Sequence, residues 1–100
     1  MYGLDEEDIQ RIISVIKPFK TIEQVVLYGS RAKGNFKPYS DIDLTLKGNK
    51  VSPDTELTIA GRLDDLLLPY KIDLSIYHLI RNKDLVDHIN RIGISLYKRN

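Results

Sequence analysis

The sequence contains no cysteine, and this absence removes two classes of structure from consideration. Without thiols the chain can form neither disulfides nor thiolate metal sites, which fits a reducing compartment. It also lacks any run approaching the roughly 20 apolar residues that a membrane-spanning helix needs. The acidic segment Asp5–Asp8 stands where a secretory signal would carry basic and then apolar residues. We therefore predict a cytoplasmic protein with no membrane segment.

An excess of charge of either sign is also missing. The formal net charge is +1, from 15 basic and 14 acidic side chains that are interspersed along the chain. The sequence therefore has no strong nucleic-acid footprint, since a duplex-binding protein needs a basic stripe or patch. Hydrophobic residues make up 42% and charged residues 29%, a balance typical of a folded chain rather than a disordered one. With no linker or repeat, residues 1–100 are predicted to form a single domain.

Helical periodicity is present in three segments. Apolar side chains recur there every three to four positions, in residues 5–17, 52–69 and 82–93. The first segment ends before Pro18, because the residue preceding a proline is disfavoured in a helix. The second begins with Ser52 as a cap and Pro53 at the first helical position, and its apolar period continues to Pro69. Asn82 is predicted to cap the third segment, which Gly93 ends.

Strand patterns occupy the intervening segments. They are an apolar run and two alternating runs, in residues 25–28, 41–46 and 70–77. Residues 94–97 fit either a short edge strand or a tail packed on the core, and the sequence leaves both open. The fold class predicted from this order is α/β (α+β), a small mixed β-sheet with helices packed on one face.

The stretch that organises the chain is Val25–Leu46, which reads VVLYGSRAKGNFKPYSDIDLTL. After the apolar strand, Gly29 turns the chain and Ser30 is predicted to cap a short helical turn that Gly34 ends. The first amides of such a turn have no partner within the helix, and glycine allows a ligand to approach the backbone closely. Gly29 and Ser30 are therefore candidate phosphate-binding residues.

A carboxylate pair follows this turn. Asp41 and Asp43 are two residues apart on a predicted strand, so both side chains project from the same face. Carboxylate oxygens suit Mg²⁺, which usually takes one or two carboxylates together with substrate phosphates. Asp73 alternates with apolar residues on the next predicted strand, and the same argument places it on the face of the first two. A phosphate cradle beside three carboxylates is the equipment for phosphoryl or nucleotidyl transfer.

Taken together, these residues resemble a known signature. Gly29-Ser30, ten intervening residues and Asp41-Ile42-Asp43 are similar to the motif of the polymerase-β-like nucleotidyltransferase superfamily. The fuller run GSRAKG…SDIDL resembles its smallest members, the minimal nucleotidyltransferases (MNT) that are paired with HEPN-domain toxins as antitoxins. The resemblance is close over the motif, and the order of elements is compatible over nearly the whole chain.

The resemblance implies a function. Gly29 and Ser30 would hold the phosphates of ATP, with Arg31 as a further candidate, although Arg31 equally fits a solvated helix position. Two Mg²⁺ ions would be bound by Asp41 and Asp43, and Asp73 would be the third catalytic aspartate. The reaction would move AMP to a hydroxyl, such as a tyrosine of a HEPN-type partner.

Other readings remain open at this stage. The chain could neutralise a HEPN toxin by direct binding without catalysis, or modify a small molecule such as an antibiotic. Larger superfamily members carry an extra helical domain that closes over the nucleotide, and this chain has none. Base recognition is therefore expected to need a second chain, either the HEPN protein or a second copy in a homo-oligomer. The two histidines, His78 and His88, are predicted to be structural or surface residues.

Overall fold

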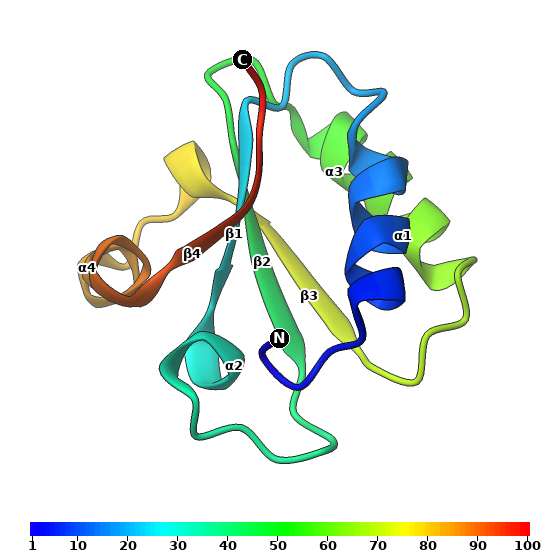
Figure 1. The fold of residues 1–100 in the computed structure, drawn as a ribbon. Helices are drawn as coiled ribbons and strands as arrows, with labels where there is room; N and C mark the ends of the chain where they lie inside the picture. The colour runs from blue at the N-terminus through cyan, green and yellow to red at the C-terminus, as the bar shows by residue number, and fades with distance from the viewer.

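Four strands form one mixed sheet in the order β3-β2-β1-β4, flanked by four helices (Figure 1). The computed structural model describes all 100 residues. Its elements, in chain order, are α1 (Glu6–Ile16), β1 (Gln24–Tyr28), α2 (Gly29–Lys33), β2 (Ile42–Lys47), α3 (Pro53–Asp64), β3 (Ile72–Ile76), the 3₁₀ turn η1 (Tyr77–Leu79), α4 (Lys83–Ile92) and β4 (Ile94–Lys98). None of the helices is long and apolar enough to cross a bilayer.

The connections explain why the sheet is mixed. β1 pairs antiparallel with both β2 and β4, whereas β2 and β3 run parallel. Parallel neighbours need a crossover connection, and α3 supplies it between β2 and β3. The predicted class, a small mixed sheet with packed helices, is confirmed. Residues 94–98 form the edge strand β4, which settles the alternative that the sequence left open.

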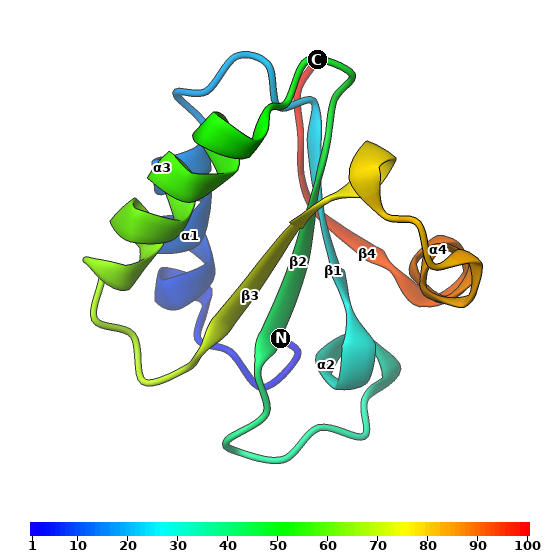
Figure 2. The same ribbon diagram turned by 180° about the vertical axis from the view of Figure 1, so that it is seen from behind.

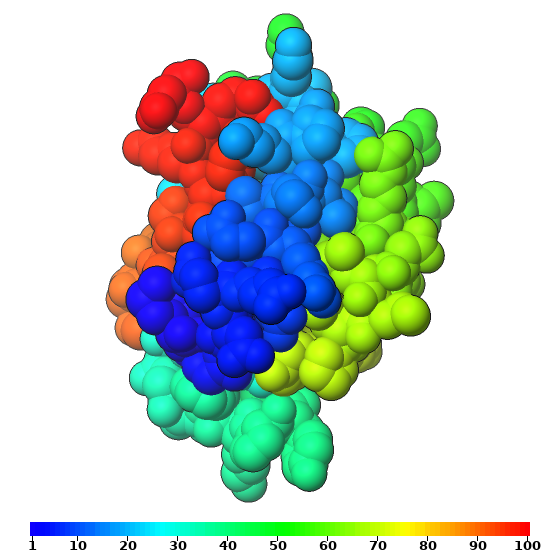
Figure 3. Space-filling view, turned by 45° about the vertical axis from the view of Figure 1, so that its right-hand side comes forward, coloured from blue at the N-terminus to red at the C-terminus, as the bar shows by residue number.

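The main core lies between the sheet and the pair α1 and α3 (Figures 1 and 2). Alternate strand residues point into it, because side chains along a strand face opposite sides in turn. Figure 3 shows α1 flanked by α3 on one side and by the C-terminal strand on the other, so the helices cover this face. The fully buried members are Ile12, Ile16, Ile22, Leu27, Ile42, Leu44, Leu46 and Ile59.

The opposite face of the sheet carries a helix of its own, contrary to the prediction that all helices pack on one side. α4 lies across the sheet from α1 and α3 (Figure 2), and its Ile89 packs with Val26 and Tyr28 of β1. The alternation of β1 explains the difference, because Val26 and Tyr28 are apolar residues that point away from the main core. α4 covers β1, whereas on the same face of the sheet Thr45 of β2 is buried and Asp73 of β3 is exposed.

The starts of α3 and α4 follow the local sequence, whereas the end of α3 does not. Ser52 accepts a hydrogen bond from the Thr55 amide at 3.3 Å, and the Asn82 side chain accepts from the amides of Asp84 and Leu85, so both predicted caps are confirmed. α3, however, ends at Asp64 rather than near Pro69.

The early end of α3 has a local cause. The backbone of Leu67 is left-handed, with φ at 55°, and its side chain is 87% exposed. The acidic residues Asp64 and Asp65 also stand at the negative end of the helix dipole, where carboxylates are unfavourable. The apolar period beyond Asp64 therefore belongs to a loop.

The side chain of Arg99 bonds the end of the C-terminal strand to the loop between α1 and β1. The guanidinium of Arg99 donates to the backbone carbonyls of Lys17, Phe19 and Ile22, at 2.9 to 3.2 Å. The Arg99 amide also donates to the Glu23 carbonyl at 2.8 Å. These bonds hold residues 94–99 along β1 as an edge strand instead of a loose tail.

Candidate active site

The candidate site begins with a row of three side chains that crosses the sheet on the α4 side. Tyr28 of β1 is in register with Asp43 of β2, and Asp43 is in register with Asp73 of β3. Neighbouring strands are about 4.8 Å apart, so the two aspartates project side by side from the same face. The predicted alternation of both strands is thus correct, and Asp73 points away from the main core.

Asp43 carries the electrostatic signature of the site. Burial raises the pKa of the Asp43 carboxyl, and the negative charges of Asp73 and then Asp41 raise it further, while His88 lowers it. Asp41 directly precedes β2 and is exposed, as is Asp73, whereas Asp43 is half-buried. The three carboxylates predicted from the sequence are therefore close enough to repel one another, with Asp43 at the centre.

The glycine turn touches this carboxylate. Gly29 has a left-handed φ of 76°, and a Cβ built on it would lie 2.3 Å from Oδ2 of Asp43. A side chain at this position would have to displace the Asp43 carboxylate, because the Gly29 backbone and this carboxylate are already in contact. The structure thus brings together the two parts of the motif, the glycine-serine turn and the aspartate pair, on neighbouring antiparallel strands.

The turn continues directly into α2, a five-residue helix that starts two residues earlier than predicted. Ser30 therefore lies inside the first turn and is not its cap. Gly34 ends the helix with a φ of 89°, as the sequence predicts. Ser30 is half-buried and directly follows Gly29, the residue that contacts Asp43.

Arg31 is not available for phosphate binding, unlike its neighbour Ser30. Its side chain is 1% exposed, and its guanidinium donates to the backbone carbonyls of Tyr2 at 2.9 Å and of Ser40 at 3.0 and 3.1 Å. The same group stacks against the rings of Phe36 and Tyr70, 5.2 and 4.8 Å from their centroids. Its hydrogen-bonding capacity is used inside the protein. We therefore correct the phosphate-binding prediction for Arg31 and interpret this residue as the anchor of the loop between α2 and β2.

His88 is the residue of the site that sequence reasoning missed. Its Nε2 accepts a hydrogen bond of 3.0 Å from the Gly29 amide, although 59 residues separate the two. Its ring also packs edge-on against Tyr28, with 6.1 Å between centroids. No spacing or motif could have indicated this contact, because it depends on where α4 docks. His88 ties α4 to the turn that carries the candidate phosphate residues.

Tyr28 borders the site on the β1 side, in register with Asp43. Burial raises the pKa of the Tyr28 hydroxyl, a hydrogen bond with Ser75 acts in the opposite direction, and the charges of Asp43 and Asp73 raise it further. The phenol therefore remains protonated over the whole neutral range, as an uncharged donor beside two carboxylates.

The three carboxylates are suitable ligands for a hard cation, although their side chains are not arranged as a preformed metal site. Asp41, Asp43 and Asp73 offer only oxygen atoms, the ligands that Mg²⁺ prefers. No three His, Asp or Glu side chains lie close enough together to coordinate an ion as they stand. Like charges favour separated rotamers, and two of the three carboxylates are exposed and free to turn. A cation would remove the repulsion that raises the pKa of Asp43.

Comparison with known proteins identifies a family. A family model described as polymerase beta, nucleotidyltransferase, matches residues 10–100. No curated protein sequence matches the chain.

Solved structures share its fold. One is a toxin–antitoxin complex with AMP-PNP, with a TM-score of 0.75 and 19% identity over 92% of this chain and 74% of that chain. A second is a tri-AMPylated Shewanella oneidensis HEPN toxin in complex with an MNT antitoxin, with a TM-score of 0.72 and 16% identity over 96% of this chain and 74% of that one. A third is a Sulfolobus solfataricus protein described as a candidate nucleotidyltransferase, with a TM-score of 0.55 and 19% identity over 99% of this chain and 89% of that one.

Proposed function

Because the chain belongs to the polymerase β nucleotidyltransferase family, we propose that it transfers AMP from Mg-ATP to a protein hydroxyl. The proposed acceptor is a tyrosine of a HEPN-type toxin, so that the protein acts as the antitoxin of the pair. We further propose that the protein can add more than one AMP to the same acceptor. The cytoplasmic location expected from the sequence remains a prediction.

One observation carries this proposal. Asp43 and Asp73 stand in register on parallel strands, and the Gly29 backbone touches Asp43 from the neighbouring strand. A turn able to bind phosphate and a carboxylate pair able to bind a cation therefore share one open surface. Nucleotidyl transfer needs both at the same place, because the phosphates and the ion are bound together.

The residues divide the work in a simple way. Ser30 would bind the terminal phosphates together with amides of the turn other than that of Gly29, which donates to His88. Asp41, Asp43 and Asp73 would hold Mg²⁺. When bound, Mg²⁺ supplies charge neutralisation for the phosphates. The acceptor oxygen would form a bond to the α-phosphorus, the bond to the bridging oxygen would break, and pyrophosphate would leave while the hydroxyl proton passes to solvent. Asp73, on the exposed edge strand, faces the side from which an acceptor can approach.

The choice of donor and partner rests on the relatives. One structure of the same fold is a toxin–antitoxin complex that contains AMP-PNP, and another contains a HEPN toxin that carries three AMP groups. The openness of the site agrees with a protein partner, because Asp41 and Asp73 are both exposed. The partner would cover the side of the nucleotide site that this small domain leaves exposed.

The decisive experiment is a transfer reaction. The protein is incubated with Mg-ATP and its HEPN partner, and the intact mass of the partner is measured. We expect additions of whole AMP units by the wild-type protein, none with Asp43→Asn or Asp73→Asn, and unchanged additions with Asp64→Asn, an exposed aspartate on α3.

The same variants test the alternative. If Asp43→Asn still neutralises the toxin as well as the wild type does, and the partner gains no mass in either case, the protein is a binding antitoxin. If the mass increase persists in Asp43→Asn, the proposed role of the carboxylates is wrong.

A further inference from the structure

The free edge of the sheet carries an apolar groove. β3 is the outer strand of the order β3-β2-β1-β4, and α3 lies beside it (Figure 2). Two hollows follow this edge, one of about 420 Å³ between α3 and β3 and one of about 170 Å³ between β3 and η1. Both are lined by Glu56 and Leu74, so they form one continuous groove, here called the edge groove. Its apolar lining includes Leu57, Ala60, Ile72, Leu74, Leu79 and Ile80.

Two leucines of the edge groove lie outside the core. Leu57 is 74% exposed and Leu79 is 51% exposed, whereas Ile59 and Leu63, on the same helix as Leu57, are buried. Large apolar side chains that are exposed together in a groove are typical of a surface that binds a partner. An apolar segment seated in the edge groove would remove both leucines from water.

The backbone of β3 is also open to a partner. The Lys71 carbonyl accepts from the Ile42 amide at 2.9 Å, so the odd-numbered residues along β3 turn their backbone groups toward β2. The amides and carbonyls of Ile72 and Leu74 therefore point to the free edge of the sheet. Such a row of unpaired backbone groups is a template for an added strand.

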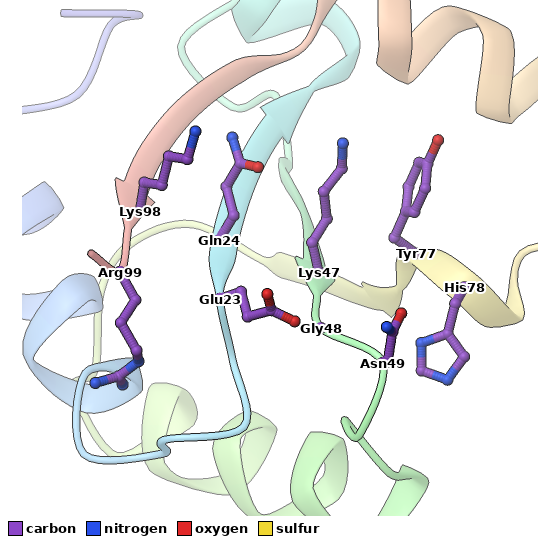
Figure 4. Close-up of a pocket in the computed structure, with 9 residues that line it drawn as sticks. All are labelled: Glu23, Gln24, Lys47, Gly48, Asn49, Tyr77, His78, Lys98 and Arg99. Atoms are coloured by element: carbon purple, nitrogen blue, oxygen red, sulfur yellow. The ribbon is translucent and has the colours of Figure 1, made fainter.

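The charges along the edge groove are acidic. Asp54 and Glu56 are the only charged residues that line it. Neither forms an ion pair, since both ion pairs of the structure lie within α1 and α4. The lysines Lys47 and Lys98 line a different pocket, which shares no residue with the edge groove (Figure 4). The edge groove therefore favours a segment that carries basic residues.

This charge also decides between two kinds of occupant. A second copy of the chain, paired edge to edge at β3, would bring Asp54 and Glu56 of one copy toward the same acids of the other. Like charges brought together in this way are unfavourable. A different protein with basic residues is free of this cost, so the charges favour a different protein over a second copy.

The edge groove and the carboxylate site meet at β3. Asp73 stands between Ile72 and Leu74 on the strand, and its side chain points to the opposite face of the sheet. A strand added at this edge would place one residue opposite Asp73, about 4.8 Å away and on the face that carries Asp43. The residues before and after it would point into the edge groove. A hydroxyl residue between two apolar residues fits both sites at once.

We propose that the edge groove binds an extended segment of the acceptor protein as a fifth strand beside β3, which rests on the proposed function for the identity of the acceptor. The segment carries a tyrosine between two apolar residues, with basic residues beyond them. The apolar residues contact Leu57 and Leu74, the basic residues pair with Asp54 and Glu56, and the tyrosine hydroxyl is presented at Asp73. The edge groove thus selects which hydroxyl of the acceptor is modified.

A peptide tests the edge groove without catalysis. The capped peptide Lys-Thr-Val-Tyr-Val-Thr-Lys is titrated into the ¹⁵N-labelled full chain in EDTA, and amide chemical shifts are followed. We expect shifts at Leu57, Ile72 and Leu74. Hydrogen exchange at the Ile72 and Leu74 amides should become slower when the peptide is bound, because an added strand supplies acceptors for them. Shifts without slower exchange would overturn the added strand.

Matched variants test the apolar and the acidic part of the edge groove separately. Leu57→Lys places a charge in the groove and should weaken peptide binding at least about tenfold. Leu67→Lys changes a leucine that is 87% exposed and lines no part of the groove, so binding should be unchanged. The wild type should bind the lysine peptide about fivefold more tightly than Glu-Thr-Val-Tyr-Val-Thr-Glu, and Glu56→Lys should reverse this order.

Other results would contradict the proposal. Shifts that avoid β3, or equal peptide binding by Leu57→Lys and Leu67→Lys, would overturn it. A wild-type chain that sediments as a dimer, with Leu57→Lys as a monomer, would also overturn it, because a second copy would then occupy the edge groove.

A second measurement uses the HEPN partner. Leu57→Lys should attach AMP to the partner at least about tenfold more slowly than the wild type, while Mg²⁺ with AMP-PNP raises the melting temperature of both proteins equally. Equal transfer rates would overturn the edge groove as the docking site of the acceptor and leave the proposed transfer intact. If the wild type transfers no AMP, the proposed function fails, whereas the peptide titration still decides whether the groove binds an extended segment.

Discussion

At the scale of single residues, Asp43 combines two roles that conflict. It occupies a half-buried position in register with Asp73, and burial together with its acidic neighbours raises the pKa of its carboxyl above the ordinary value of 3.8. An ionised Asp43 is therefore a cost to the folded protein. This is the arrangement expected of a residue kept for binding a cation rather than for stability.

The cost gives a pH-dependent prediction for Asp43→Asn. Between pH 3.8 and the raised folded pKa, the folded state binds more protons than the unfolded state, so the stability of the wild type falls as pH rises. At pH 7 in EDTA we expect Asp43→Asn to melt at a higher temperature than the wild type. The difference should disappear below the unfolded pKa, where both carboxyls are protonated. A lower melting temperature at pH 7 would instead give Asp43 a structural role.

Gly29 and Gly34 form a matched pair for a second prediction. Both have left-handed backbones, so an alanine at either site should cost about 1–2 kcal/mol in unfolding free energy. At Gly29 the new Cβ would also displace the Asp43 carboxylate, whereas at Gly34 it would meet open space. We expect Gly29→Ala alone to abolish AMP transfer, measured by intact mass, while both variants lose similar stability. Wild-type transfer by Gly29→Ala would show that the turn and the carboxylate are not coupled.

Arg31 leads to a third prediction, about stability. Arg31→Met removes the donor to the carbonyls of Tyr2 and Ser40 and leaves these part-buried groups without it. We expect a loss of about 2–4 kcal/mol in denaturant unfolding, because each unsatisfied buried group costs 1–3 kcal/mol. Lys33→Met on the same helix is exposed and should change stability by less than about 0.5 kcal/mol. Equal stability of the two variants would contradict the anchoring role.

At the scale of elements, α4 decides the shape of the site. It packs on the face that carries the aspartates, through Ile89 against Val26 and Tyr28, and its His88 accepts the hydrogen bond of Gly29. Its Asn90 also accepts from Tyr77 at the other end of the sheet. One helix therefore makes contacts at both ends of this face of the sheet.

The contact of α4 with the turn can be measured. His88→Ala removes the acceptor of the Gly29 amide and the edge contact with Tyr28, so we expect a loss of about 1–2 kcal/mol in unfolding free energy. Hydrogen exchange at the Gly29 amide should become faster than in the wild type. His78→Ala, on the exposed turn η1, should leave that exchange rate unchanged. Slow exchange in His88→Ala would mean that the turn is held by other contacts.

At the scale of the whole molecule, the protein is a small sheet with two different faces. α1 and α3 cover one face, and the other, here called the working face, carries α4 and the aspartates. On the working face the register sets an acidic row at one end and a basic row at the other. Asp41 and Asp73 of the acidic row are exposed, so a ligand there has protein on one side only. We expect the bound nucleotide to be completed by a partner chain.

Ligand binding to the intact domain provides the last prediction. A ligand present at about 100 times its dissociation constant stabilises the folded state by about 2.7 kcal/mol, and for a domain of this size that raises the melting temperature by roughly 10 °C. We expect Mg²⁺ with AMP-PNP to produce such a shift for the wild type and for Asp64→Asn. Asp43→Asn should show none, and removal of Mg²⁺ by EDTA should abolish the shift. A full shift in EDTA would separate nucleotide binding from the carboxylates.

The sequence by itself determined the features that depend on near neighbours. Helix and strand periods, the caps Ser52 and Asn82, and the glycine end of α2 follow from local backbone preferences. The alternation of β2 places Asp41 and Asp43 on the polar side of that strand, and the alternation of β3 does the same for Asp73. These features were predicted because each depends on residues a few positions apart, whereas the pairing that sets Asp73 beside Asp43 does not.

Only the tertiary structure decided which distant groups meet. The docking of α4 brings His88 to Gly29. The loop after α2 folds so that the buried Arg31 donates to the carbonyls of Tyr2 and Ser40, contacts that no local pattern in the sequence indicates. The strand order and the register align Lys98, Gln24 and Lys47 in one row. Such contacts join residues tens of positions apart, and they depend on packing of the whole sheet and its helices. Local patterns carry no information about that packing.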